Sequence, residues 1–309
     1  MKLGRTAGVT DTGRRRMRNE DALVLRPPLF AVADGMGGAR AGEIAARLAA
    51  AALEEAGTDT MGEKAVSSLI EEANRRIWQR SLTDPATAGM GTTVTAALVD
   101  AATGTVAIGH VGDSRAYRLR GDTLEQLSTD HSLVAELVQS GVLTPEEAER
   151  HPQRSAITRA LGTEPAVEVE VLTVDAEVGD LFLLCSDGLS AMLGDDEIAA
   201  AIENAGRDPQ SAGESLVAAA NAHGGEDNIT VVLFELVDGE APVGEVAEIS
   251  IVGVDRPESE PVDRASPTPD EGADVNRHGA GPGGQLASLA LIALVVVVGL
   301  LALYWGISR

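Results

Sequence analysis

The sequence predicts an α+β fold in which helices pack outside stacked antiparallel sheets. Short apolar runs with strand propensity, bounded by Gly, Asp and Asn, recur through residues 1–237. Amphipathic helical patterns come in pairs between groups of these runs. Because a doubly wound parallel sheet needs a helix after nearly every strand, the paired spacing favours α+β.

The elements follow one another along residues 1–237. The predicted strands are ALVLR (22–26), FAVAD (30–34), TTVTAALVD (92–100), TVAIGHV (105–111), AYRLR (116–120), VEVEVLTV (167–174), DLFLLCSD (180–187) and NITVVLFELV (228–237). The predicted helices cover residues 42–55, 63–81, 132–140, 145–150, 195–204 and 209–223. We expect all of them to belong to one domain.

Residues 238–284 have a composition that does not support a core. They contain six of the 13 prolines, eleven acidic and three basic residues, and no aromatic residue. Such a segment cannot bury enough apolar surface to offset the entropy lost on ordering. The sequence therefore predicts a disordered, acidic, proline-rich tether here.

Residues 285–308 carry no charged side chain and include the run LALIALVVVVGLLALYW. Because about 20 apolar residues span a bilayer, this stretch predicts one C-terminal transmembrane helix, with a buried core helix as the alternative. The amino terminus has no apolar run behind its basic residues, so it does not indicate a secretory signal. We therefore expect a single-pass protein of the cell membrane, with its folded domain in the cytoplasm.

The charge and cysteine content exclude several classes of protein. Forty-eight acidic and 24 basic residues give a formal net charge of −24, which disfavours nucleic acid as a partner. The same acidity is compatible with divalent cations, which bind carboxylate oxygens. The single cysteine, Cys185, cannot form an internal disulfide or a zinc–cysteine cluster. It lies inside an apolar run, so we expect a buried core residue and not a nucleophile.

Four aspartates share one context, at the edge of an apolar strand and next to a residue that permits an unusual backbone turn. They are Asp34, Asp113, Asp187 and Asp227. Each alone could be a turn former. Strand ends can converge on one cleft, however, and clustered carboxylates repel one another unless a cation binds among them. Oxygen-only ligation with few nearby histidines favours Mg²⁺ or Mn²⁺ over zinc or copper.

A second acidic pair, Glu20 and Asp21, follows a run of arginines in GRRRMRNED. Guanidinium groups present paired donors that match phosphate oxygens, so arginines beside metal ligands indicate a site for a phosphoryl group. The alternative is a basic surface turn with incidental charge pairing. The four arginines are Arg14, Arg15, Arg16 and Arg18.

Several motifs in a fixed order make residues 5–237 resemble the metal-dependent protein phosphatases of type 2C, specifically their bacterial serine/threonine branch. The motifs are RMRNEDA, ADGMGG, GMGTT, VGDSRAYR, TDHS, HPQRSAITRALG, LLCSDGLS and EDNITVV. The resemblance implies a four-layer α-β-β-α sandwich, made of two antiparallel sheets flanked by helix pairs. It also implies a catalytic domain over residues 1–237 and a flap beside the active site, bracketed by His131 and His151.

The same resemblance implies a role for each acidic residue. Asp34 would bridge two ions of Mn²⁺ or Mg²⁺, and the Gly35 carbonyl would join one of them. Asp187 and Asp227 would complete the first ion, Glu20 and Asp21 would support the second, and Asp113 would bind a possible third. Arg16 stands at the spacing of the phosphate-binding arginine, with Arg15 and Arg18 as alternatives. Met36 occupies the position of a histidine that animal members use as a proposed general acid.

We therefore expect hydrolysis of phosphoserine and phosphothreonine in proteins. Two ions roughly 3.5 to 4 Å apart would activate a water for in-line attack, with Asp34 and Arg16 as the catalytic residues. The expected partners are phosphorylated proteins, including transmembrane serine/threonine kinases whose action the enzyme opposes. The alternative is a catalytically silent, membrane-tethered scaffold that binds phosphoproteins.

Overall fold

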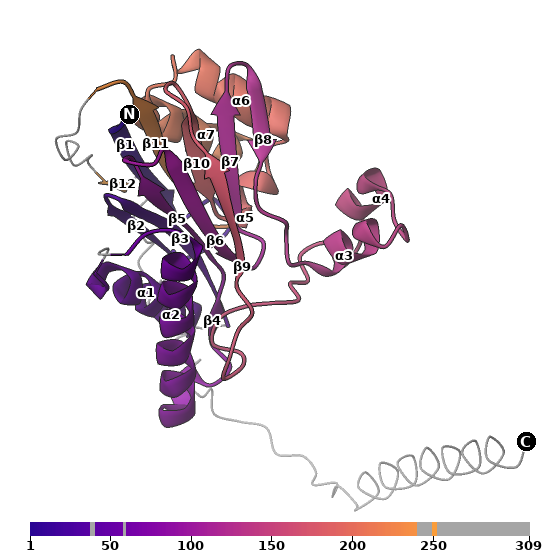
Figure 1. Cartoon of the computed structure of the whole chain (residues 1–309). Helices are drawn as coiled ribbons and strands as arrows, with labels where there is room; N and C mark the ends of the chain where they lie inside the picture. The colour runs from indigo at the N-terminus through magenta and orange to yellow at the C-terminus, as the bar shows by residue number, and fades with distance from the viewer. Residues whose placement is uncertain (38–40, 58–59, 240–248, 252–309) are drawn as a thin grey trace, which may run out of the picture. The chain divides into compact units, whose positions relative to one another are not determined.

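Two stacked sheets form the centre of the protein (Figure 1). The computed structural model describes residues 1–37, 41–57, 60–239 and 249–251, so the predicted transmembrane helix and most of the predicted tether lie outside the described residues. The first sheet has the order β12 (Ile249–Ile251), β1 (Lys2–Asp11), β11 (Ile229–Val237), β10 (Leu181–Cys185), β7 (Arg115–Arg120), β8 (Thr123–Gln126). The second has the order β2 (Asp21–Arg26), β3 (Leu29–Met36), β5 (Val94–Asp100), β6 (Thr105–Val111), β9 (Glu170–Asp175), and β4 (Gly91–Thr92) pairs with β3.

The space between the sheets is filled by side chains of alternate strand positions, which point to one face of each sheet. Phe30 of β3 stacks on Phe234 of β11 with ring centroids 4.4 Å apart. Phe182 of β10 stacks on the same ring at 5.0 Å. These are the three phenylalanines of the chain, and all are buried. The aromatic contribution to the core is therefore concentrated where the two sheets meet.

A pair of helices covers the outer face of each sheet (Figure 1). Alanine-rich α1 (Ala41–Glu55) and α2 (Glu63–Thr83) bury their apolar faces on the second sheet. Helices α6 (Asp195–Asn204) and α7 (Pro209–Ala222) cover the first sheet. The α+β prediction is therefore confirmed, with two stacked sheets flanked by helix pairs.

Four short helices lie at the margins of these layers. They are η1 (Pro85–Thr87), α3 (Leu133–Gln139), α4 (Pro145–Glu149) and α5 (Asp187–Ser190). Helices α3 and α4 form a projection beside the sheets, which we call the flap (Figure 1). Ser132 caps α3 and Thr144 caps α4 through their hydroxyl oxygens.

The structure departs from the prediction in a few elements. The strands β1, β4 and β8 were not among the predicted ones, and the predicted strand 180–187 ends at Cys185 because Asp187 begins α5. Within the predicted tether, β12 pairs in parallel with β1, while every other strand pairing of the described residues is antiparallel. In the part of the chain that the structure describes, no helix is long and apolar enough to cross a bilayer.

Candidate metal centre and phosphate site

The strand ends of both sheets bring the predicted aspartates together. Asp21, at the start of β2, pairs in register with Asp34 of β3. The remaining members stand beside strand ends: Asp113 two residues after β6, Asp187 two residues after β10, and Asp227 two residues before β11. Residues far apart in the sequence therefore meet because antiparallel neighbours begin and end at the same edge.

Electrostatic repulsion shows how closely these carboxyls approach one another. Desolvation, together with the charges of Asp21 and Asp187, raises the pKa of Asp34 well above its usual range. Desolvation and the charge of Asp187 raise the pKa of Asp113 to about 7, and desolvation also raises that of Asp21 to about 7. Carboxyls with pKa values raised by one another share a single low-dielectric site.

Asp34 is held through its backbone by the GMGTT segment. Thr93 N donates to the Asp34 carbonyl at 2.9 Å, and Thr92 Oγ1 donates to the same oxygen at 2.8 Å. In return, Asp34 N donates to Thr93 Oγ1 at 3.3 Å. The side chain of Asp34 is left unrestrained by these contacts and faces the other carboxyls.

Two carboxylate oxygens of the site have no hydrogen-bond partner although they are buried. Ser186 Oγ donates to Asp21 Oδ2 at 2.9 Å, but Asp21 Oδ1 is unpartnered in the structure. Asp187 Oδ1 is unpartnered in the same way. Leaving a buried charged oxygen without a partner costs more free energy than a hydrogen bond returns, so both oxygens require a ligand.

Asn228 ties the arginine-containing segment to this cluster. Its Nδ2 donates to the carbonyls of Thr12 and Arg18 at 2.9 and 2.8 Å, while its Oδ1 accepts from Glu20 N at 2.8 Å. Asn228 N donates to Asp227 Oδ1 at 2.8 Å. One buried amide therefore positions both Glu20 and Asp227.

Gly35 allows the backbone of β3 to pack closely at the site. A Cβ atom added there would lie 2.3 Å from the Gly42 carbonyl oxygen and 2.5 Å from the Glu20 carbonyl oxygen. A Cβ added at Gly42 would lie 2.9 Å from Glu20 Oε2. The two glycines thus permit β3, the start of α1 and Glu20 to come together, which any side chain would prevent.

Arg16 reaches the carboxylates from the surface. Its guanidinium donates to Asp227 Oδ2 at 2.6 Å, and its side chain remains 49% exposed. Partial burial lowers the pKa of Arg16, but the hydrogen bond to Asp227 and the nearby negative charges raise it by more. Arg16 therefore keeps its charge. A permanent cation with free donors at the edge of the cluster can meet an anionic substrate.

The donor set fits a divalent cation of the oxygen-binding type. All the clustered side chains are carboxylates, and two of their buried oxygens lack partners. Arg16 and Arg115 offset only part of the effect of burial and mutual repulsion, so the pKa of Asp187 remains raised. As the side chains stand, no three His, Cys, Asp or Glu residues of the described segments form a metal cage. The fit to a divalent cation therefore rests on the carboxylate chemistry and on the two unpartnered oxygens.

His110, His131 and Cys185 make structural contacts near the site. His110 is fully buried, and its ring packs against that of His131 in a tilted arrangement, with the centroids 4.7 Å apart. His131 Nδ1 accepts from Gly112 N at 3.0 Å, next to Asp113. Burial raises the pKa of the Cys185 thiol to about 12, so it is not a nucleophile.

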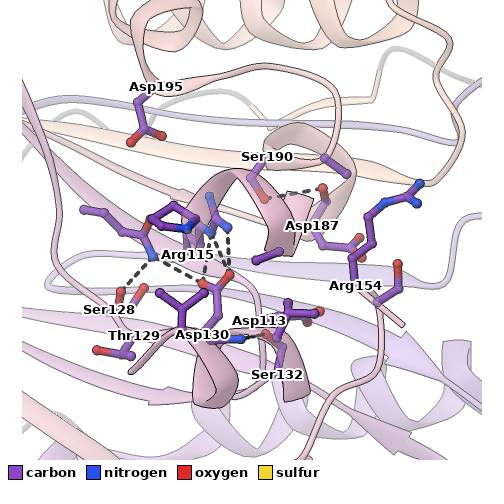
Figure 2. Close-up of a pocket in the computed structure, with 18 of the residues that line it drawn as sticks. Asp113, Arg115, Ser128, Thr129, Asp130, Ser132, Arg154, Asp187, Ser190 and Asp195 are labelled. Atoms are coloured by element: carbon purple, nitrogen blue, oxygen red, sulfur yellow. Dashed lines mark hydrogen bonds and ion pairs between the residues drawn. The ribbon is translucent and has the colours of Figure 1, made fainter. Parts of the chain in front are cut away.

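A pocket of about 910 Å³ adjoins the cluster, and Asp113 and Asp187 are among its lining residues. Figure 2 shows Ser132, which caps α3, on the opposite side of this pocket from Ser190 of α5. The pocket therefore runs between the flap and α5, beside the carboxylates.

Comparisons with known proteins agree with this geometry. The family model described as Protein phosphatase 2C matches residues 14–228. The chain is 39% identical to a serine/threonine phosphatase stp of Listeria innocua over 238 residues, which cover 73% of this chain and 93% of that protein. It resembles the crystal structure of the Mycobacterium tuberculosis serine/threonine phosphatase PstP/Ppp with a TM-score of 0.71 and 38% identity, covering 76% of this chain and 99% of the other. A structure of the PstP catalytic domain in complex with two manganese ions gives a TM-score of 0.69 at 37% identity, covering 76% and 98%.

All seven predicted metal-site residues and Arg16 lie in or beside one cluster. Sequence reasoning did not assign roles to Thr92, Thr93, Ser186 or Asn228, although each neighbours a predicted residue or stands within a quoted motif. The available signal was their position: hydroxyl and amide side chains beside clustered carboxylates commonly orient them.

Proposed function

This chain belongs to the protein phosphatase 2C family, and from that premise we propose how its clustered carboxylates and Arg16 act on a substrate. The chain is a serine/threonine protein phosphatase that depends on Mn²⁺ or Mg²⁺ and acts on phosphorylated proteins. The observation that carries the assignment of residues is the pair of buried, unpartnered oxygens on Asp21 and Asp187.

The carboxylates would divide between two ions and a weaker third. Asp34 would help to hold the first two, as the family resemblance implies, and the charges of four other aspartates act on its carboxyl. The other ligands would be Asp187 and Asp227 for the first ion, Gly35 through its carbonyl for one of the two, Glu20 and Asp21 for the second, and Asp113 for the third.

When bound, the ions supply positive charge and a water of lowered pKa for attack on phosphorus. Arg16 binds the phosphoryl oxygens and stabilises the charge that grows on them in the transition state. Its partner Asp227 is also one of the proposed ligands, so Arg16 would exchange this ion pair for the phosphoryl oxygens of the substrate. Asn228 and Thr93 keep the carboxylates in place.

The test uses the full chain and a phosphothreonine peptide, with and without manganese. Asp34→Asn and Asp187→Asn each preserve side-chain shape but remove a charge, so phosphate release should fall by a factor of at least about 100. Asp122→Asn is the matched control, since the Asp122 side chain is fully exposed on a turn at 101%. Undiminished release by the Asp34 and Asp187 variants would contradict the assignment.

We also propose that residues 285–308 anchor the chain in the cell membrane, with the phosphatase domain (residues 1–237) cytoplasmic and residues 238–284 as its tether. The uncharged run and the acidic, proline-rich composition support this arrangement. Transmembrane serine/threonine kinases in the same membrane are then proposed substrates.

Fractionation tests the anchor directly. The full chain should sediment with membranes, whereas a chain that ends at residue 280 should remain in the supernatant. Equal distribution of the two forms would remove the anchor, although phosphatase activity would be unaffected.

A further inference from the structure

Helix α3 of the flap is apolar but poorly covered. Five of its seven residues are apolar, and none of its residues is buried. Val134, Ala135 and Val138 instead line the 910 Å³ pocket beside the carboxylates. An amphipathic helix normally buries its apolar side chains against a neighbouring element. These three side chains of α3 are not buried against such a neighbour among the described residues and instead face the pocket.

Apolar side chains also reach the pocket from the segment that follows α5. Met192 and Leu193 line it there. Methionine is flexible and adapts to differently shaped apolar ligands. The pocket therefore offers apolar surface from two separate parts of the chain.

The charged groups at the base of the pocket largely satisfy one another. Arg115 Nε and NH2 donate to Asp130 at 2.9 and 2.7 Å, and Gln126 Nε2 donates to the same carboxylate at 3.2 Å. Tyr117 OH accepts from Arg115 at 3.1 Å and donates to Asp195 at 3.2 Å. A ligand side chain in this part of the pocket does not need to bring a charge.

Asp113 and Asp187 line this pocket as well as the proposed metal centre. A polypeptide whose phosphorylated residue lies at the metal centre must continue past these two aspartates, and the pocket is continuous with them. Figure 2 shows both residues on the same side of the pocket as Arg154.

We propose that the groove between α3 and Met192 binds an apolar side chain of the protein substrate, a few residues from the phosphorylated one. The inference rests on the proposed function and adds a substrate preference to it. An apolar side chain placed against Val134, Val138 and Met192 loses its contact with water, which stabilises the bound segment.

The experiment measures kcat/KM of the full chain with manganese. The substrates are phosphothreonine peptides in an alanine background, with one leucine placed in turn at each position from four before to four after the phosphothreonine. We expect leucine at one or two positions to raise kcat/KM about tenfold over alanine, as apolar pockets do. The para-nitrophenyl phosphate ester, which has no side chain for the groove, reports the chemistry by itself.

Two variants of the groove and a matched control complete the test. Val138→Ser and Met192→Ser should reduce the leucine preference to about twofold or less. Both substitutions should lower kcat/KM for para-nitrophenyl phosphate less than kcat/KM for the leucine peptide. Val142→Ser, at a flap residue that is 65% exposed and outside the pocket, should retain the preference. Thermal unfolding, monitored by circular dichroism, checks that each variant is folded.

The outcomes separate the subsite from the enzyme. Hydrolysis of all peptides with no leucine preference, or with a preference that both groove variants retain, overturns the subsite alone. A second set of peptides carries aspartate in place of leucine at the same positions. A preference for aspartate over leucine that is lost in Arg154→Ala assigns recognition to the exposed Arg154 and also overturns the subsite. Absence of hydrolysis of every peptide and of para-nitrophenyl phosphate overturns the phosphatase function on which the subsite depends.

Discussion

Thr93 Oγ1 lies 2.6 Å from Ser114 Oγ in a contact that is buried on both sides. Thr93 N also donates to the Asp34 carbonyl, Thr93 Oγ1 accepts from Asp34 N, and Ser114 directly follows Asp113. Two carboxylates that reach the site from different strands are therefore linked through one pair of hydroxyl groups. Hydrogen bonds of this kind, made to the residues that bind a metal, commonly influence how tightly the site holds the metal.

Replacing Thr93 should weaken metal binding without unfolding the domain. Thr93→Val keeps the shape but leaves Ser114 Oγ and Asp34 N without their partner, so we expect about tenfold weaker Mn²⁺ binding. Thr93→Ser retains the hydroxyl and should bind nearly as the parent does. Titration calorimetry of the full chain measures both affinities. Equal weakening by valine and serine would show that the methyl group matters and the hydroxyl does not.

Arg16 should be the arginine that contacts the phosphoryl group. Arg16→Ala should lower kcat/KM for a phosphothreonine peptide by about 100-fold, because a charged donor to the transition state is lost. Arg16→Lys keeps the charge but not the paired donors and should recover only part of the activity. Arg15→Ala is the neighbouring control, because Arg15 is exposed. A larger loss for Arg15→Ala would transfer the phosphate-binding role to that residue.

The metal-free protein should lose stability as the pH rises. The folded-state pKa values of Asp21 and Asp113 are raised to about 7 from an ordinary 3.8. A raised acid pKa means that the folded state holds the proton longer, so stability is full below about pH 4 and is lost through about pH 7. Each such proton contributes a slope of about 1.4 kcal/mol per pH unit within that window.

Urea denaturation in the presence of a chelator, at pH values from 4 to 8, measures this slope. Asp113→Asn removes one of the titrating carboxyls and should flatten it. Saturating Mn²⁺ should reverse the trend, because the ion binds the ionised carboxylates of the folded state. A metal-free protein whose free energy of unfolding rises steadily over this range would contradict the electrostatic picture of the site.

Local patterns predicted the parts of the fold that depend on local chemistry. Helix α6 has the predicted bounds, and α1, α2 and α7 differ from prediction by two residues or fewer at each end, because periodicity and caps define a helix along the chain. The strand β1 was not predicted, although it pairs with β11 along most of its length. Gly4, Gly8 and several polar residues weaken the strand pattern of its sequence. Pairing across more than 200 residues supplies what its own sequence does not.

The site shows the same division. The carboxylates could be predicted from their strand-end positions and from the family resemblance, and the structure brings them together. The multiple contacts of Asn228 with Thr12, Arg18 and Glu20 could not be predicted, because they join segments 208 to 216 residues apart. Hydrogen bonds between segments far apart in the chain produce no recognisable pattern of residue spacing in the sequence.

The parallel pairing of β12 with β1 places the last described strand at one edge of the first sheet. In the first sheet β12 occupies one border, whereas Arg115 of β7 and Gln126 of β8, which line the pocket, belong to the far border. With neighbouring strands about 4.8 Å apart, roughly 20 Å of sheet separates the two. The last strand that the structure describes is thus separated from these pocket-lining residues by most of the width of the first sheet.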